Sequence, residues 1–247
     1  MKKTSPDLSI VIPCFNEAKN VTLVLEQLQN IIKQSKYFLE VIVIDGGSTD
    51  NTPKELQEIF KSLPEDNFKL ILNKKRGGYG ADITKALSKA KGKILSWTHA
   101  DMQTDPEDVI KALDLYKNSK EEKVIIKGKR KNRKLSEAFF TFGMQMIVFL
   151  VLRKYLDDIN AQPKLFSKEF YNRHIKNKAP SDFSLDLYLL YQAKINGYKI
   201  KEIPVYFKDR IHGEAKGGGS FKTRIKLIKR TFQYICELKL KLRPSSK

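Results

Sequence analysis

The chain has 247 residues and a formal net charge of +19, with 47 Lys plus Arg against 28 Asp plus Glu. This length allows one α/β domain with a sizeable core and a short appendage. The two cysteines, Cys14 and Cys236, stand at opposite ends of the sequence, which excludes a disulfide framework and a cysteine-based metal site. The positive charge favours an anionic partner such as a membrane surface, a nucleic acid or a phosphorylated substrate.

Four short apolar runs are typical of buried strands and lie at residues 8–12, 39–44, 68–72 and 93–97. Between the first two runs, apolar residues recur at helical spacing from Val21 to Ile32, and we expect Asn16 to cap this helix. Pro106 opens a further helical stretch after the fourth run. Strands separated by helices predict an α/β domain with an open, mostly parallel sheet and helices on both faces.

Polar residues and glycines stand where these strands end. Asp45 and the pair Gly46-Gly47 follow the second strand, and the glycines allow a tight turn close to a ligand. Asp101 and Gln103 follow the fourth strand. Ligands of open parallel sheets bind at this edge. A carboxylate and an amide oxygen two residues apart suit a hard divalent cation held against a diphosphate, although an acid at such a position is also a common helix cap.

Four ordered motifs give the sequence a family resemblance. They are Val-Ile-Pro-Cys-Phe-Asn-Glu at residues 11–17, Val-Ile-Asp-Gly-Gly-Ser-Thr-Asp at 43–50, Arg-Gly-Gly-Tyr-Gly-Ala at 76–81 and Ala-Asp-Met-Gln at 100–103. In their order and spacing, as far as about Gly128, the chain resembles the family 2 inverting glycosyltransferases, which have a nucleotide-sugar-binding GT-A fold. Ala-Asp-Met-Gln and residues 209–216 look most like the polyprenyl-phosphate (dolichol-phosphate) sugar transferases.

The resemblance implies roles for particular residues and a cofactor, Mg²⁺ or Mn²⁺. It places Asp101 and Gln103 at the metal. The residues implied to bind the nucleotide sugar are Pro13, Phe15, Asn16, Glu17, Asp45, Arg76, Gly77, Ala100 and Asp101. The implied catalytic residues are Asp101, Asp186 and Arg210. Those implied to bind the phosphate or the acceptor are Arg130, Arg210 and Lys216.

Two positions depart from the family pattern. His99 stands where the lipid-phosphate transferases usually have the first acid of Asp-Ala-Asp. A neutral imidazole is a poor partner for Mg²⁺ but can ligate a transition metal, which favours Mn²⁺. Alternatively, His99 hydrogen-bonds the diphosphate or a neighbouring loop. Gly46 stands where many relatives have a second Asp, which leaves Asp45 as the acid for a nucleotide contact.

The acceptor side depends on Asp182 and Asp186, at the start of a helix expected from residue 182 to about 193. Asp182 is a candidate helix cap. Asp186 aligns, by resemblance, with the acid that faces the acceptor. For a sugar hydroxyl acceptor it would be the general base, whereas a lipid phosphate is already ionised at pH 7 and needs none.

Two further polar segments are candidates for substrate contacts. The first segment, residues 157–162, contains Asp157, Asp158, Asn160 and Gln162. The overlapping residues 160–166 are expected to shape the donor-sugar pocket. Alternatively, they form an ordinary turn into a strand. Residues 210–222 combine glycines with Arg210, His212, Lys216 and Lys222. By resemblance this loop would clamp a phosphate, and the alternative is a flexible connector.

Residues 139–152 form the longest apolar run, which is shorter than the roughly 20 residues of a membrane span. It is either a buried helix or, as the flanking basic residues lead us to expect, an interfacial helix that meets a lipid acceptor. Residues 221–247 repeat apolar residues at helical spacing among many Lys and Arg, with Glu237 as the single acid. Such a helix is typical of membrane-surface binding, and equally of a terminal helix docked on the domain.

We therefore expect a catalytic domain at residues 1–220 and a basic amphipathic tail at 221–247. Residues 1–7 show no apolar signal segment, which predicts a cytoplasmic protein that is peripheral at the membrane. The expected reaction moves a hexose from a nucleotide-sugar donor to a polyprenyl phosphate. The open alternatives are a sugar hydroxyl of a glycolipid or polysaccharide as acceptor, and a catalytically inactive relative.

The sequence also bears on two other kinds of partner, a nucleic acid and a second copy of the chain. A nucleic-acid partner would explain the charge but not the polar loops at the strand ends, and the sequence contains no recognition motif for nucleic acid. We therefore expect no nucleic-acid binding. A homo-oligomer is compatible with the sequence.

Overall fold

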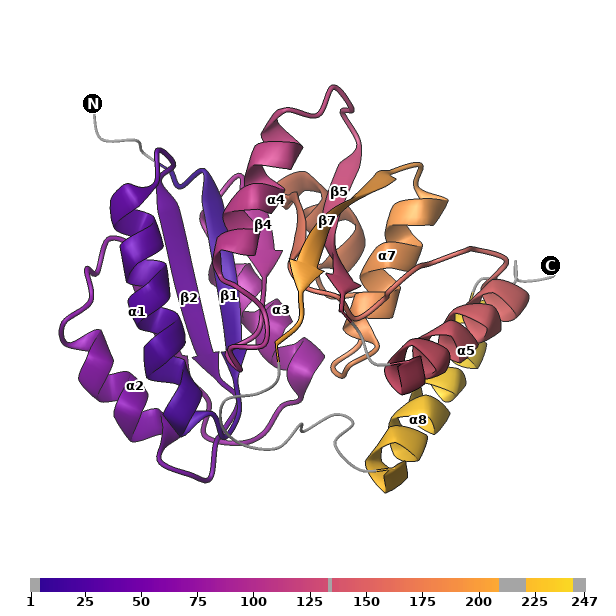
Figure 1. Cartoon of the computed structure of the whole chain (residues 1–247), viewed down its shortest axis with the longest axis horizontal. Coiled ribbons are helices and arrows are strands. Elements are labelled where there is room, and N and C mark those ends of the chain that lie inside the picture. Colours follow the sequence, from indigo (N-terminus) through magenta and orange to yellow (C-terminus); the bar gives the residue numbers. More distant parts are fainter. Residues whose placement is uncertain (1–4, 133–134, 209–220, 242–247) are drawn as a thin grey trace.

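The computed structural model of the chain describes residues 5–132, 135–208 and 221–241. Within these residues a seven-stranded sheet has the order β3-β2-β1-β4-β6-β5-β7 (Figure 1). The strands are β1 (Leu8–Cys14), β2 (Leu39–Asp45), β3 (Phe68–Leu72), β4 (Ile94–Trp97), β5 (Val124–Lys131), β6 (Lys164–Ser167) and β7 (Lys199–Tyr206). Neighbouring strands are parallel except at β6, which runs antiparallel to β4 and β5. The predicted open, mostly parallel sheet is confirmed.

Helices α1 (Ala18–Gln34), α2 (Thr52–Phe60) and α4 (Glu107–Lys117) cover one face of the sheet. Ile12 of β1 packs in this layer, while its neighbour Val11 belongs to the core of the opposite face, as the alternation of a strand requires. Because helices cover both faces, β2 is buried along its whole length. Burial on both faces explains why strands such as β1 and β2 appear in the sequence as continuous apolar runs.

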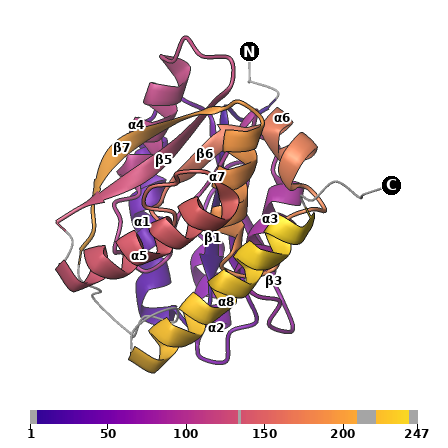
Figure 2. The same ribbon diagram turned by 90° about the vertical axis from the view of Figure 1, so that its right-hand side faces the viewer.

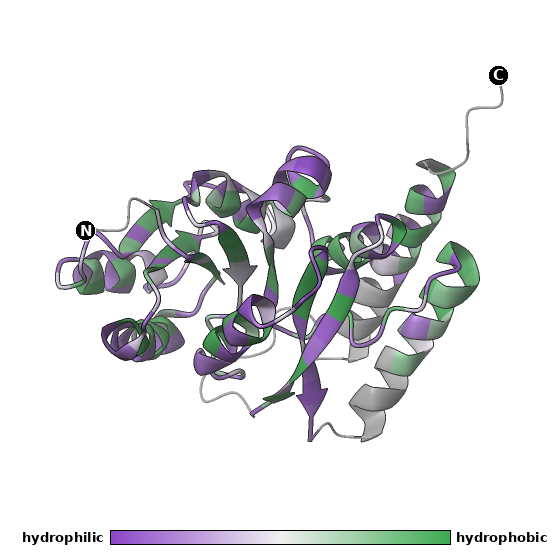
Figure 3. Ribbon diagram, turned by 90° about the horizontal axis from the view of Figure 1, so that it is seen from above, coloured by the Kyte–Doolittle hydropathy of each residue, from purple (hydrophilic) through white to green (hydrophobic). Residues whose placement is uncertain are grey.

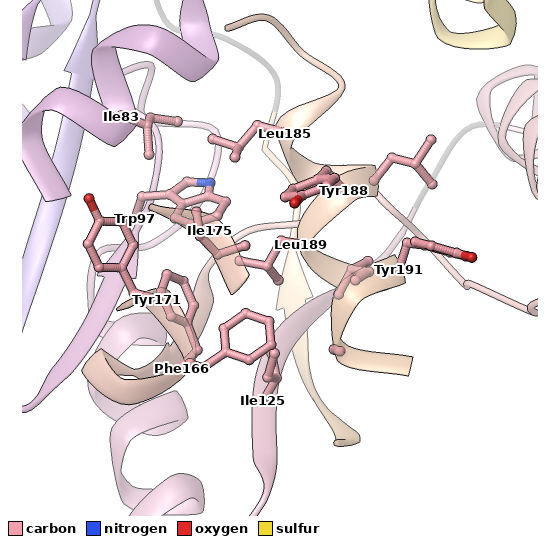
Figure 4. Packing of buried hydrophobic residues seen from close by; sticks show 14 of the residues in the cluster. Ile83, Trp97, Ile125, Phe166, Tyr171, Ile175, Leu185, Tyr188, Leu189 and Tyr191 are labelled. Carbon is pink, nitrogen blue, oxygen red and sulfur yellow. The ribbon is translucent and has the colours of Figure 1, made fainter. Parts of the chain in front are cut away.

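Helices α3 (Tyr79–Lys89), α6 (Lys168–Phe170) and α7 (Leu185–Ile195), with the π-helix η1 (Tyr171–Ile175), cover the opposite face. Figure 4 shows this core, which contains side chains from β4, β6 and α7. The Trp97 and Phe166 rings meet edge to face, with 5.5 Å between their centres. The predicted placement of helices on both faces is confirmed.

Helices α5 (Leu135–Leu152) and α8 (Phe221–Lys241) lie side by side at one end of the sheet (Figures 1 and 2). Each contributes buried residues to the core that α7 covers, namely Val148, Leu152, Ile235 and Leu238. The C-terminal helix is therefore docked on the domain, and a separate tail beginning at residue 221 stays a prediction. In the described residues, no helix has both the length and the apolar character that a bilayer crossing requires.

Two predicted helix starts were wrong. Helix α1 begins at Ala18, with Glu17 at the cap position, and the side chain of Asn16 does not cap it. Helix α7 begins at Leu185, not at Asp182. Asp182 instead accepts a hydrogen bond from the backbone N of Ser184 at 2.8 Å, which shapes the turn before the helix. The Asn16 side chain instead accepts from the backbone of Thr49 in the loop after β2.

Candidate active site

Hydrogen bonds hold the loops after β1 and β2 together. Asn16 has a φ of 54°, and its backbone N donates to Ser48 Oγ at 2.8 Å. Its side-chain Oδ1 accepts from the Thr49 backbone N, also at 2.8 Å. The backbone N of Glu17 donates to Thr52 Oγ1 at 2.9 Å. Asn tolerates this left-handed conformation better than most residues, so Asn16 suits the turn that fixes the edge of the sheet.

Asp45 organises its own turn. Its Oδ2 accepts from the backbone N atoms of Gly47 and Ser48, both at 3.1 Å, and its Oδ1 accepts from Ser48 Oγ. Cys14 is buried beside this turn, and desolvation, followed by the charges of Asp45 and Glu17, raises the pKa of its thiol. Cys14 is therefore a neutral thiol without nucleophilic character.

The loop after β3 closes on the first two loops. The Arg76 guanidinium lies over the Phe15 ring, 4.1 Å from its centre, in an attractive cation–π contact. Gly47 has a φ of 78°, and a Cβ there would lie 2.8 Å from the Arg76 backbone N, so glycine is required. The predicted nucleotide-sugar residues at the ends of β1, β2 and β3 thus share one edge of the sheet: Pro13, Phe15, Asn16, Glu17, Asp45, Arg76 and Gly77.

Asp101 and Gln103 follow β4 in a tight turn. Met102 has a φ of 59°, and the backbone N of Gln103 donates to Asp101 Oδ1 at 3.1 Å. Gln103 also binds the end of β7, because its Nε2 donates to Lys208 O at 3.2 Å and its O accepts from Lys208 N at 2.8 Å. Ala100 is buried immediately before the turn. Both predicted metal ligands are therefore fixed at the carboxyl edge of the sheet.

The donor set of this turn fits Mg²⁺ or Mn²⁺. Carboxylate and amide oxygens are hard ligands, and Mg²⁺ is commonly held by one or two carboxylates together with substrate phosphates and water. In the part of the chain that the structure describes, no three His, Cys, Asp or Glu side chains converge. His99 lies close by, with its ring centre 6.3 Å from that of Tyr79.

A buried network lies behind this edge. Lys164 is fully buried, and its Nζ lies 3.1 Å from Asp186 Oδ1. The same Nζ donates to the carbonyl oxygens of Ile159, at 2.8 Å, and Ala161, at 2.5 Å. Gln162 Nε2 donates to Asp186 Oδ1 at 2.8 Å. Burial lowers the pKa of Lys164, and the charge of Asp186 opposes that shift.

Tyr79 connects the network to the donor loops. Its hydroxyl accepts from Gln162 Nε2 at 3.3 Å, and its ring stacks on Phe183 with 4.8 Å between centres. Burial and the charge of Asp186 raise the pKa of this phenol, so it stays neutral. Sequence reasoning named Gln162 and Asp186 individually, whereas Tyr79 and Lys164 entered only as members of the segments 76–81 and 160–166. The signal that could have singled out Lys164 was a lysine placed between Pro163 and the apolar Leu165-Phe166 pair.

Several predicted acceptor residues remain predictions. The backbone N and Nε of Arg130 donate to the Asp158 carboxylate at 2.8 and 2.9 Å, so Asp158 offsets the charge of this arginine. The guanidinium also lies 5.5 Å from the Phe207 ring centre. Arg210 and Lys216, together with the rest of the glycine-rich loop, lie outside the described residues.

The chain has a GT-A fold, as its sheet order and the helices on both faces of the sheet show. Solved structures of glycosyltransferases with that fold are similar to it. A mannosyltransferase from Pyrobaculum calidifontis in complex with GDP-Man and Mn²⁺ has a TM-score of 0.67 at 18% identity, covering 95% of this chain and 65% of that one. Glucosyl-3-phosphoglycerate synthase from Mycobacterium tuberculosis, in complex with Mg²⁺ and UDP, has a TM-score of 0.71 at 14% identity, covering 97% of this chain and 81% of that one.

The family follows from the sequence comparison. Glycosyl transferase family 2 matches residues 9–179, more than half of the chain, so the chain belongs to that family. A dolichyl-phosphate beta-glucosyltransferase of Dictyostelium discoideum is 24% identical over 213 residues, covering 80% of this chain and 65% of the relative. A dolichol-phosphate mannosyltransferase of Pyrococcus furiosus is 26% identical over 215 residues, covering 85% and 58%. The chain thus spans less than two thirds of the length of either relative.

Proposed function

We propose that this chain transfers a hexose, with inversion, from a nucleotide-sugar donor to a polyprenyl phosphate at the cytoplasmic face of a membrane. The names of the two relatives support a dolichyl phosphate type of acceptor. The similar structures with GDP-Man or UDP support a nucleotide donor. A divalent cation at Asp101 and Gln103 would supply positive charge that stabilises the departing diphosphate.

The observation that carries the choice of acceptor is the environment of Asp186. A general base must come within hydrogen-bonding distance of the hydroxyl that it deprotonates. Lys164 and Gln162 both bind Asp186 Oδ1, and the residue is only 3% exposed. Because the whole carboxyl group is buried, a sugar hydroxyl could reach it only if this network moved. A phosphate acceptor is ionised at pH 7 and needs no base, so the geometry supports a phosphate.

The remaining residues act by binding and orientation. The Phe15–Arg76 pair holds the nucleotide at the ends of β1 and β3, and the turn of Asp101 lies beside the diphosphate. Asp186 fixes the position of Gln162, and Gln162 orients the hexose. A phosphate oxygen of the acceptor attacks C1 from the side opposite the diphosphate, so that the new C1–O bond forms as the old one breaks. Attack from this side inverts the configuration at C1.

One side of α5 supports the membrane location. Phe142, Met146, Phe149 and Leu150 form this apolar face of α5, and they are between 37% and 60% exposed. Their spacing places them on one side of the helix, and Figure 3 shows apolar colour along the described part of α5. The neighbouring α8 exposes Lys229 and Lys239. An apolar helix face beside cations is typical of binding to an anionic lipid surface.

A transfer assay with matched acceptors tests the proposal. The full chain is incubated with Mn²⁺ or Mg²⁺, radiolabelled GDP- or UDP-hexose, and vesicles that contain either polyprenyl phosphate or the corresponding polyprenol. We expect label in the phosphate and not in the alcohol. Asp101→Asn should lower turnover about 100-fold or more, because the departing charge loses its stabilisation. Asp105→Asn, in the same loop, is the control and should keep turnover.

Two results would contradict the proposal. Transfer to the polyprenol or to a glycolipid hydroxyl, without transfer to polyprenyl phosphate, would show that the acceptor group is a hydroxyl and not a phosphate. Nucleotide binding without transfer from any hexose donor to any of these acceptors would make the chain a catalytically inactive relative. Circular dichroism of both variants should match that of the unaltered protein, so that a loss of turnover is not a loss of fold.

A further inference from the structure

A second carboxylate occupies the space that Gly46 leaves at the end of β2. A Cβ at Gly46 would lie 2.5 Å from Asp82 Oδ2 and 3.3 Å from Cys14 O. Asp82 reaches this place from the first turn of α3. Any side chain at position 46 would therefore collide with the carboxylate of Asp82.

The two neighbouring carboxylates differ in what they bind. Asp45 accepts three hydrogen bonds from its own turn and is 1% exposed. Asp82 is 7% exposed, and its Oδ1 accepts from Asn73 Nδ2 at 2.7 Å. A carboxylate offers about four lone-pair sites. Asp82 therefore keeps the greater capacity to accept hydrogen bonds from a ligand.

Asp82 also lines a wide-open surface cavity of about 500 Å³, with Asn73, Lys74, Lys75, Gly77, Ala81 and Lys85. Two of these residues, Lys75 and Gly77, flank Arg76 in the sequence, and the Arg76 guanidinium lies over Phe15. Burial, and then the nearby charge of Asp45, raises the pKa of Asp82, while the hydrogen bond from Asn73 opposes the shift. A ligand that donates hydrogen bonds to Asp82 would therefore stabilise a carboxylate that its surroundings disfavour.

We propose that Asp82 selects a guanine nucleotide as the sugar donor by accepting hydrogen bonds from the base. Guanine carries adjacent N1–H and N2–H donors on one edge, which match the two oxygens of a carboxylate. Uracil offers one N3–H between two carbonyl oxygens, and these repel a carboxylate. The lysines of the cavity are donors for the guanine acceptors O6 and N7. This inference rests on the proposed function, because it concerns the donor of that reaction.

The test combines a change in the ligand with a change in the protein. GDP, UDP and IDP, which lacks the guanine N2 amine, are titrated calorimetrically into the full chain with Mn²⁺. The unaltered protein should bind GDP about 10- to 100-fold more tightly than IDP or UDP, as expected for a hydrogen bond to a charged group. In Asp82→Asn, the preference for GDP over IDP should fall to within about threefold.

Asp108→Asn is the matched control, because Asp108 is a buried acid in the first turn of α4, where it pairs with Lys111. It should leave all three affinities unchanged. Equal losses for GDP, IDP and UDP in Asp82→Asn would make Asp82 a support of the α3 turn and overturn the proposal.

The three nucleotides also test the proposal on the unaltered protein, whether or not Asp82→Asn folds. Binding of UDP as tight as that of GDP, or tighter, would overturn guanine selection. Hexose transfer from a UDP-sugar to polyprenyl phosphate would then keep the proposed function while this inference fails. If the protein binds no nucleotide at all, both the proposed function and the guanine selection by Asp82 are wrong.

Discussion

Lys164 shows how one residue can hold a site together from inside the core. It is a cation with no exposed surface, surrounded by Asp186 and the carbonyl oxygens of Ile159 and Ala161. A buried charge persists only when it is paired and hydrogen-bonded. Lys164 and Asp186 therefore depend on each other, and each fixes the position of the other beside the ligand edge.

Breaking this pair should destabilise the protein strongly. In Lys164→Met the Asp186 carboxylate stays buried without its partner, and we expect the free energy of unfolding to fall by about 3–5 kcal/mol. Urea unfolding at pH 7 measures this change. Lys194→Met, at an exposed position on α7, is the control and should change stability by less than about 0.5 kcal/mol. Equal effects of the two substitutions would show that the pair contributes nothing.

The sequence revealed some site residues because they directly follow apolar runs. Asp45, Asp101 and Gln103 could be placed at strand ends in this way. Tyr79 was included only through the family motif at residues 76–81, and Asp82 could not be placed, because on α3 it looks like an ordinary residue of a first helical turn. Their relation to the site arises only when α3 packs across the ends of β1 and β2, which brings distant parts of the chain together.

At the scale of elements, one carboxylate links three strands at the amino end of the sheet. Glu40 of β2 is 1% exposed and accepts from Ser9 of β1 and from Lys69 of β3. It also accepts from the Lys91 backbone N, which precedes β4, at 2.8 Å. Burial would raise the pKa of Glu40, but these partners together lower it below its usual value.

Acid stability should therefore depend on Glu40. Its folded-state pKa lies below the unfolded value of about 4.3, so its stabilisation is present above that pH and is lost as pH falls through the folded-state pKa. Glu40→Gln should lower the free energy of unfolding at pH 7 by about 1–3 kcal/mol. The difference from the unaltered protein should shrink below about pH 4. Thermal unfolding between pH 3 and pH 7 measures both, and a difference independent of pH would contradict the prediction.

Strands β1 to β4 were predictable to within two residues at each end, but β5 and β7 were not. The reason is charge. Lys127 of β5 is 2% exposed and pairs with Glu202 of β7 at 2.8 Å, so a buried strand carries a residue that is typical of surfaces. The partner lies far along the sequence, and no local pattern reveals it. The basic residues at positions 127, 129 and 130 thus face acids of the same domain.

At the scale of the whole molecule, the charge of +19 remains after these pairs are considered. Lys129 lies 2.8 Å from Asp157, and Arg130 is paired with Asp158. Pairing within the fold redistributes charge without changing its sum. An excess of this size favours anionic surfaces, and at the proposed membrane location the apolar face of α5 would add a second, short-range attraction.

Vesicle binding should separate these two components. The protein should sediment with anionic vesicles at low salt and be released as salt rises, because the screening length falls to about 8 Å at physiological ionic strength. Phe149→Ser with Leu150→Ser should weaken binding at all salt concentrations. Leu72→Ser with Ile195→Ser removes exposed apolar residues elsewhere and should have no effect. Equal binding to neutral and anionic vesicles would contradict the electrostatic component.

The reversal of β6 has a consequence for how such a chain changes over evolutionary time. The residues predicted to hold the donor follow β1 to β4 and end at Gln103. Strand β6 begins, rather than ends, at the same edge, so Gln162 comes from the segment that leads into it and Lys164 is its first residue. The residues predicted to hold the nucleotide and those proposed to orient the hexose are thereby encoded in two successive stretches of sequence. If these roles hold, selection can alter the later stretch and acquire a new sugar while the nucleotide site is inherited intact.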